Sequence, residues 1–184
     1  MADWFTSISD EHREFIEKQH VFFVATAPEG DGDVNLSPKG GTLLRVLGPN
    51  LVGYLDYPGS GNETARHLAQ TSRITLMLCS FDAGARILRL YGEGRRVDLD
   101  APELAQYRPA FVDDFHPYVR QAFFVEVQKV QTSCGYAVPK MQFISDRDTL
   151  DRWCENKLVP RAMEGGAPLP GRFVRKDGTV VAER

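Results

Sequence analysis

The chain has 184 residues, 26% of them charged, and a formal net charge of −3 at pH 7. This length favours one domain with a sizeable core, and the small net charge gives no electrostatic reason to expect nucleic acid or an anionic membrane as a partner. No apolar run is long enough for a transmembrane helix, and residues 1–7 lack the basic and apolar segments of a secretory signal. We therefore expect one cytoplasmic domain over residues 1–184.

The first half of the chain predicts one helix followed by short strands. The helix is expected over residues 9–19, with Ser9 or Asp10 at its start. Apolar segments separated by Gly, Pro, Asn and Asp turns then predict the strands. These strands are expected at residues 21–27, 33–37, 42–47, 51–57, 74–79 and 87–97. Short strands joined by tight turns are typical of an antiparallel meander or barrel.

Two features interrupt this run of strands. Residues 62–71 predict a helix, and Ser60 followed by Glu63 fits an S-x-x-E capping box at its start. Gly92 and Gly94 stand inside the strand expected at 87–97. Glycine there indicates a bulge, or the close approach of a ligand or another backbone.

The second half of the chain adds helices and one long strand. Helices are expected over residues 101–108 and 146–159. Alternating apolar and polar residues predict a strand with one buried face over residues 121–130. We place the core at about residues 15–139 and a C-terminal helix and tail at residues 146–184.

Residues suited to a ligand gather in two segments, 34–41 and 54–64. Both place small residues and hydroxyls where strands end, and the second opens into the helix at 62–71. A helix start offers free N–H groups and a positive dipole end to a phosphate, and Lys39 adds a full charge. We interpret the segments as the phosphate site of flavin mononucleotide (FMN). The structural alternative is that they form only a helix cap and a turn.

Three motifs in order carry a family resemblance. Asn-Leu-Ser-Pro-Lys-Gly (35–40) is followed by Tyr-Leu-Asp-Tyr and Ser-Gly-Asn-Glu-Thr (54–64), then by Arg-Leu-Tyr-Gly-Glu-Gly-Arg (89–95). This order resembles the pyridoxamine 5′-phosphate oxidase-like family. The resemblance implies a mainly β fold, a six-stranded antiparallel split β-barrel with flanking helices. It also implies a homodimer with FMN between the subunits, and an FMN-dependent oxidoreductase acting on a small-molecule substrate.

The resemblance carries cofactor contacts onto two strands of this chain. Ser37 and Lys39 match the strand that contacts the flavin ring and phosphate. Tyr54, Leu55 and Asp56 match the strand that runs under the ring.

Further matched contacts follow these strands. Ser60, Gly61, Asn62 and Thr64 match the phosphate-binding loop and helix start. Arg89 is expected to reach ribityl or phosphate oxygens.

The chain also departs from the oxidase proper. Gly61-Asn62 stands where the oxidase has a basic pair, and no segment closely matches its C-terminal Arg-x-His pattern. The first departure would weaken phosphate binding, and the second argues against oxidation of pyridoxamine phosphate. No catalytic residue is identified. Cys134 is expected to contact the flavin or serve as a thiol, with a simply buried small residue as its structural alternative.

Other functions on the same barrel remain open. One is a deazaflavin-dependent reductase, and another is a non-catalytic flavin or haem protein. Haem needs an axial ligand, for which His67, His116 and Cys134 are the candidates. The third is a vestigial pocket on a functional dimer. We expect no metal site, because the three cysteines and four histidines show no zinc-ligand spacing.

Overall fold

The computed structural model describes residues 2–41, 44–59, 61–82, 84–111, 118–158, 173–174 and 180–182. Its larger sheet comprises β1 (Ala2–Phe5), β2 (Val21–Thr26), β3 (Asn35–Gly40), β4 (Leu44–Gly48), β5 (Leu51–Asp56), β6 (Arg73–Cys79), β7 (Arg86–Val97) and β8 (Gln121–Cys134). The helical elements are α1 (Asp10–Glu17), α2 (Glu63–Leu68), α3 (Pro102–Tyr107), η1 (Arg108–Phe111), α4 (Thr149–Trp153) and η2 (Cys154–Leu158). A small second sheet pairs β9 (Phe173–Val174) with β10 (Val180–Ala182).

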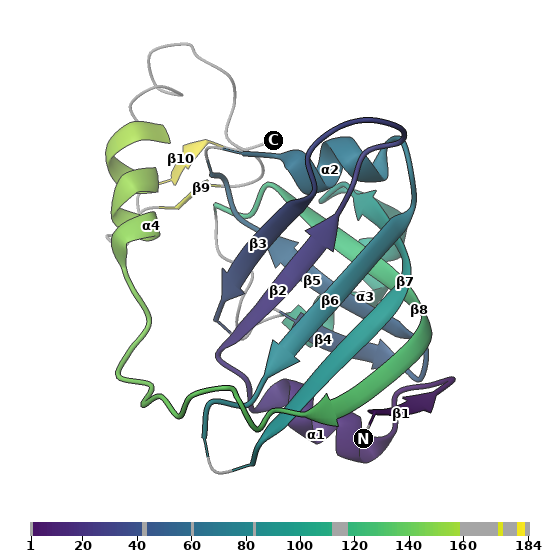
Figure 1. Cartoon of the computed structure of the whole chain (residues 1–184). Helices are drawn as coiled ribbons and strands as arrows, with labels where there is room; N and C mark the ends of the chain where they lie inside the picture. Colours follow the sequence, from purple (N-terminus) through teal and green to yellow (C-terminus); the bar gives the residue numbers. More distant parts are fainter. Residues whose placement is uncertain are drawn as a thin grey trace.

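The larger sheet curls into an open barrel (Figure 1). Its strand order is β3-β2-β6-β7-β8-β5-β4, with β1 also paired to β8, and every pairing is antiparallel. The two end strands, β3 and β4, do not pair with each other, so the barrel is split between them. The predicted mainly β, antiparallel split barrel with flanking helices is confirmed, although the sheet has eight strands instead of six.

The sequence of the additional strand β1 and of the extended end of β8 shows little of the pattern that predicts a strand. All four residues of β1 are exposed, so this strand shows no alternation of buried and exposed positions. Strand β8 continues four residues beyond its predicted end, through the polar sequence Gln-Thr-Ser-Cys. Those residues are held in the strand because all four pair with β7 and the first three also pair with β1.

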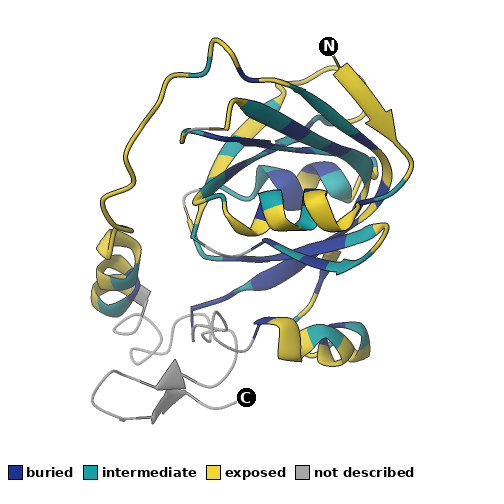
Figure 2. Ribbon diagram, turned by 90° about the horizontal axis from the view of Figure 1, so that it is seen from below, coloured by how far each residue is buried: buried dark blue, intermediate teal, exposed yellow. Residues whose placement is uncertain are grey.

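The core lies inside the barrel. Strand β2 alternates half-buried and buried residues, whereas β5 and the first half of β8 are buried on both faces. Tyr54, Phe123 and Phe124 are fully buried at the β5–β8 pairing. Seen from below in Figure 2, α1 lies across the end of the barrel. Two of its own residues, His12 and Ile16, are buried.

Gly92 explains the bend in the long strand β7. The register of β7 against β8 shifts between Tyr91 and Gly92, as in a β-bulge. A Cβ at Gly92 would lie 2.0 Å from the backbone oxygen of Glu126, so a side chain does not fit there. Both expectations for this glycine, a bulge and the close approach of another backbone, are met.

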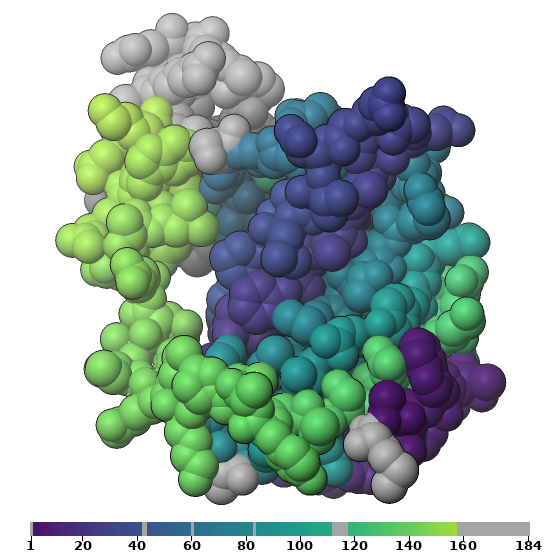
Figure 3. Space-filling model, in the orientation of Figure 1, coloured from purple at the N-terminus to yellow at the C-terminus, as the bar shows by residue number. Residues whose placement is uncertain are grey.

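A C-terminal arm, residues 135–158, leaves the barrel after β8 and leads to α4 and η2 (Figure 3). The Met141 N–H donates to the Phe81 carbonyl oxygen at 2.8 Å, and the Phe143 ring stacks on His20 with centroids 3.7 Å apart. The predicted helix at 146–159 starts three residues later than expected, at Thr149. Within the described ranges, no helix is long and apolar enough to cross a membrane.

Candidate functional site

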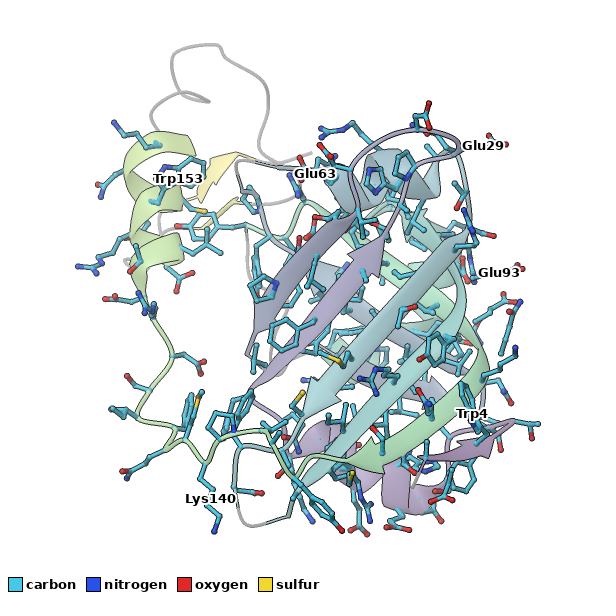
Figure 4. All side chains as sticks on the ribbon, viewed as in Figure 1. Trp4, Glu29, Glu63, Glu93, Lys140 and Trp153 are labelled. Atoms are coloured by element: carbon cyan, nitrogen blue, oxygen red, sulfur yellow. The ribbon has the colours of Figure 1, made fainter. Side chains whose placement is uncertain are left out.

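One end of the barrel holds a pocket of about 410 Å³. It is lined by Ser37, Pro38, Lys39, Asp56, Tyr57, Gly59, Gly61, Asn62, Glu63, Thr64 and Arg120. Strand β3 supplies one wall, the end of β5 the opposite wall, and the start of α2 a third. In Figure 4, Glu63 marks this end of the barrel and Trp4 the other. The volume is in the range of pockets that bind small molecules.

Asp56 lies at the centre of the pocket's charges. Its Oδ1 lies 2.9 Å from Nζ of Lys39, and its Oδ2 lies 2.8 Å from Nε of Arg120. Gln121 Nε2 also donates to Oδ2, at 2.8 Å. The carboxylate is 2% exposed, so these partners replace the water it loses. The Lys39–Asp56 pair also joins β3 to β5 across the split of the barrel.

The partners of Asp56 keep it ionised. Burial raises the pKa of this carboxyl, but the charge of Lys39 and hydrogen bonds from Lys39, Gln121 and Arg120 outweigh burial and lower the pKa below its ordinary value. Asp56 therefore carries a negative charge at neutral pH and holds both cations beside the pocket.

Lys39 and Arg120 keep donors free for a ligand. A lysine ammonium has three N–H donors and an arginine guanidinium has five. Lys39 donates to Asp56, whereas Arg120 donates to Asp56 and, through Nη2, to the Gly61 carbonyl oxygen at 2.9 Å. Among the described residues no further partner is found, so both cations can donate to a phosphate or carboxylate.

The start of α2 differs from the predicted capping box. The helix begins at Glu63 with Asn62 as its N-cap, so Glu63 is the first helical residue and not the third. The Asn62 side chain makes no cap bond and instead accepts from Gln121 Nε2 at 2.8 Å. The predicted box is wrong in register, and Ser60 lies outside the described residues.

Two predicted contacts, Tyr54 and Leu55, lie behind the pocket and not in its wall. Both are fully buried, and the Tyr54 ring packs on Phe22 and Phe123. Among the described residues the Tyr54 hydroxyl has no partner at good hydrogen-bond geometry, and the Thr64 side chain is the polar group that interacts with it. Burial and the negative charge of Asp56 raise its pKa well above the ordinary tyrosine value, so it stays protonated.

Two other predicted contacts, Arg89 and Cys134, lie away from this pocket. Arg89 Nη1 donates to Ser133 Oγ at 3.2 Å on the neighbouring strand. Strand β8 begins at Gln121, beside Asp56, and ends at Cys134, which is exposed. Neither residue lines this pocket.

Six of the predicted residues do line the pocket: Ser37, Lys39, Asp56, Gly61, Asn62 and Thr64. Sequence reasoning missed Arg120, whose backbone N–H donates to the Asp56 carbonyl oxygen at 3.0 Å. The one feature of the sequence that could have pointed to Arg120 was its position directly before a predicted strand. Tyr57 was also missed, although it belongs to a quoted motif. Burial and the charge of Asp151 raise the pKa of Tyr57 to about 12.

The family follows from residues 8–134, which match the sequence model described as pyridoxamine 5′-phosphate oxidase. The chain belongs to this family. An Aspergillus flavus protein described as pyridoxamine 5′-phosphate oxidase family protein ustO is 37% identical over 151 residues, which make up 81% of this chain and 61% of that protein. The chain thus spans 61% of that relative's length, and the predicted family resemblance is confirmed.

Solved structures with the same fold include two bacterial proteins. HupZ of Group A Streptococcus has a TM-score of 0.55 and 15% identity, covering 67% of this chain and 91% of that chain. HutZ of Vibrio cholerae, described as a heme storage protein, has a TM-score of 0.52 and 15% identity, covering 70% of this chain and 97% of that chain. At these identities the likeness shows the shared split barrel alone.

Proposed function

We propose that this family member binds FMN and acts as an oxidoreductase on a small-molecule substrate. The observation that carries the proposal is the pocket in which Lys39 and Arg120 keep free N–H donors beside the hydroxyl of Thr64. Donors of both kinds suit a phosphate. The pocket's predicted residues lie within the region that matches the family.

The charges around the pocket fit a phosphate group. Lys39 and Arg120 contribute two positive charges, and Asp56 cancels one of them. Glu63 is also at the rim, but it is paired with Arg66 at 2.7 Å. Each charge-assisted hydrogen bond to the phosphate would contribute about 1.5–3 kcal/mol.

Bound FMN would supply the electron or hydride transfer, which the protein's own side chains do not perform. Lys39 and Arg120 would anchor the phosphate, and Asp56 keeps both cations in place. With a pKa raised to about 12, Tyr57 keeps its hydroxyl hydrogen at neutral pH.

We also propose that the protein forms a homodimer with the cofactor between the subunits. Arg89, carried over from the family, and Cys134, expected to contact the flavin, both lie away from the pocket of their own protomer. A second subunit would bring them to a cofactor. Light scattering with size-exclusion chromatography should give twice the monomer mass, and Arg89→Ala should weaken flavin binding in the dimer. A cytoplasmic location stays a prediction.

Haem and deazaflavin remain the alternatives to FMN, with no observation of this structure favouring them. Among the haem ligands considered, His67 is buried and its Nδ1 lies 3.0 Å from Thr26 Oγ1. His116 lies outside the described residues. Cys134 is exposed and away from the pocket.

The visible absorbance spectrum of the purified protein, with and without added FMN, tests the proposal. A flavin band that dithionite bleaches and heating releases is the expected result. A protein that is colourless and also fails to bind added FMN contradicts the proposal, and deazaflavin and haem are then the next cofactors to add.

A further inference from the structure

Side-chain hydrogen bonds run from the pocket wall into the barrel. Ser37 Oγ donates to Asn35 Oδ1 at 2.9 Å, and Asn35 Nδ2 donates to Thr64 Oγ1 at 3.3 Å. The same nitrogen donates to Thr26 Oγ1 at 3.4 Å, and this oxygen lies 3.0 Å from Nδ1 of His67. Ser37 and Thr64 line the pocket, whereas the other three residues lie behind it.

The orientation of the Asn35 amide follows from its partners. As placed, both N–H groups have an acceptor, in Thr26 and Thr64, and the carbonyl oxygen has a donor in Ser37. If the amide were turned over, its two N–H groups would face the single oxygen of Ser37, and one would lack a partner. Half-buried polar groups favour the arrangement that satisfies more of them.

His67 supports this arrangement from the inner end. Thr26 is 3% exposed and His67 is 9% exposed, so both need partners within the protein. Thr26 Oγ1 accepts from Asn35 and forms a second hydrogen bond with Nδ1 of His67. Whichever of these two atoms donates, the bond to His67 holds Thr26 in place and, through it, Asn35.

The Asn35 amide gives the two pocket hydroxyls opposite roles. A hydroxyl has one hydrogen and two lone pairs. Ser37 uses its hydrogen on Asn35, so it presents lone pairs to the pocket. Thr64 accepts from Asn35, and its second lone pair can accept from the neighbouring Tyr54 hydroxyl, so the Thr64 hydrogen is available to a ligand.

We infer that Asn35 is a positioning residue that sets the ligand specificity of this pocket. Thr64, together with the free N–H groups of Lys39 and Arg120, suits a phosphate, which at neutral pH mainly accepts hydrogen bonds. Ser37 suits a hydroxyl donor. The ligand class that meets both needs is a phosphate ester of a hydroxylated chain. The inference rests on the proposed function, since FMN belongs to this class.

Asn35→Asp tests the inference, because aspartate keeps the shape but accepts from both hydroxyls and turns the Thr64 hydrogen away from the pocket. The measurement is the dissociation constant for FMN and for riboflavin, which lacks only the phosphate. FMN affinity should fall by about tenfold or more, and riboflavin affinity by less than about threefold. Gln106→Glu makes the same amide-to-carboxylate change at an exposed position of α3 and should alter neither constant.

A double-mutant cycle separates the role of Thr64 from the added charge. If Asn35 acts through Thr64, the loss of FMN affinity caused by Asn35→Asp should shrink by about threefold or more in a Thr64→Val background. Direct repulsion of the phosphate would instead persist there in full. Thr64→Val alone should also lower the preference for FMN over riboflavin, which keeps the inference testable if Asn35→Asp does not fold.

The outcomes distinguish this inference from the proposed function. Wild-type protein that binds neither flavin overturns the proposed function and the inference with it. Wild-type protein that binds FMN, while Asn35→Asp leaves the preference for FMN over riboflavin unchanged, overturns the inference alone. An equal loss for both flavins also overturns it, because Asn35 would then only support the fold.

Discussion

Two clusters of carboxylate–cation pairs in this protein differ in how far they are exposed to solvent. At the pocket, Asp56 bonds Lys39 and Arg120 and is 2% exposed. On the outer surface, Arg95 bonds Glu103 and Glu126, and Arg95 is 40% exposed. Water screens the outer cluster, whereas the Asp56 carboxylate of the pocket cluster depends on its protein partners.

The difference in burial predicts that the two clusters differ in how much the protein loses when one of their pairs is broken. An exposed ion pair contributes about 0–1 kcal/mol and can be lost without consequence. A buried cluster adds little net stability over apolar residues but is costly to break. The pocket cluster is therefore best understood as the means of holding two cations at a ligand site, and the substitutions below test that view.

Asp56→Ala should produce the largest loss of stability. It leaves Lys39, Arg120 and Gln121 without their shared acceptor in a largely buried place. The free energy of unfolding should fall by about 3–5 kcal/mol, which urea denaturation measures. A loss of less than about 1 kcal/mol would mean that water reaches the cluster freely.

Arg120→Gln should weaken FMN binding while the fold persists. It removes a cation from the pocket but keeps a polar side chain beside Asp56. FMN affinity should fall by about tenfold or more, equivalent to about 1.4 kcal/mol, as measured by flavin fluorescence titration. Arg95→Gln is the matched control, because it removes the same charge outside the pocket. Equal effects of the two substitutions would show that only net charge matters.

The pH dependence of stability should also distinguish the clusters. Because the folded pKa of Asp56 is lowered, its stabilisation is present above the unfolded value of about 3.9 and is lost as pH falls through the folded pKa. Unfolding free energy measured between about pH 5 and pH 2 should thus fall less steeply in Asp56→Asn than in wild type. Parallel curves for Asp56→Asn and wild type would contradict the lowered pKa.

The barrel could be predicted from local patterns. Which side chains of its central strands face the core and which face a ligand could not be predicted. Strand β2 was located from its apolar run between turns, and its burial alternates. Strand β5 is buried along both faces from Val52 to Asp56, so no alternation says which side chains face a ligand. The family resemblance alone assigned Tyr54 to the cofactor, and its ring packs in the core.

Only those pocket residues that lie in short sequence motifs could be predicted. Lys39 and Asp56 lie in such motifs, but their pairing across the split depends on how the barrel closes. Arg120 follows Asp56 by 64 residues and reaches it through the pairing of β5 with β8. No local sequence pattern predicts the contact between Arg120 and Asp56. The same holds for Asn35 and His67, which Thr26 connects.

Glu126→Ala should have the smallest effect, and it sets the baseline for the other substitutions. Glu126 is 66% exposed and lies 3.1 Å from Arg95 Nη1, which keeps Glu103 as a second partner. The change in unfolding free energy should be at most about 0.5 kcal/mol in low salt and should shrink further near 1 M salt, where charges are screened within about 3 Å. The effect of Asp56→Ala should persist at that salt concentration, because the Asp56 carboxylate is 2% exposed and salt mainly screens exposed charges. If salt reduced both effects alike, the two clusters would share one environment and the comparison would fail.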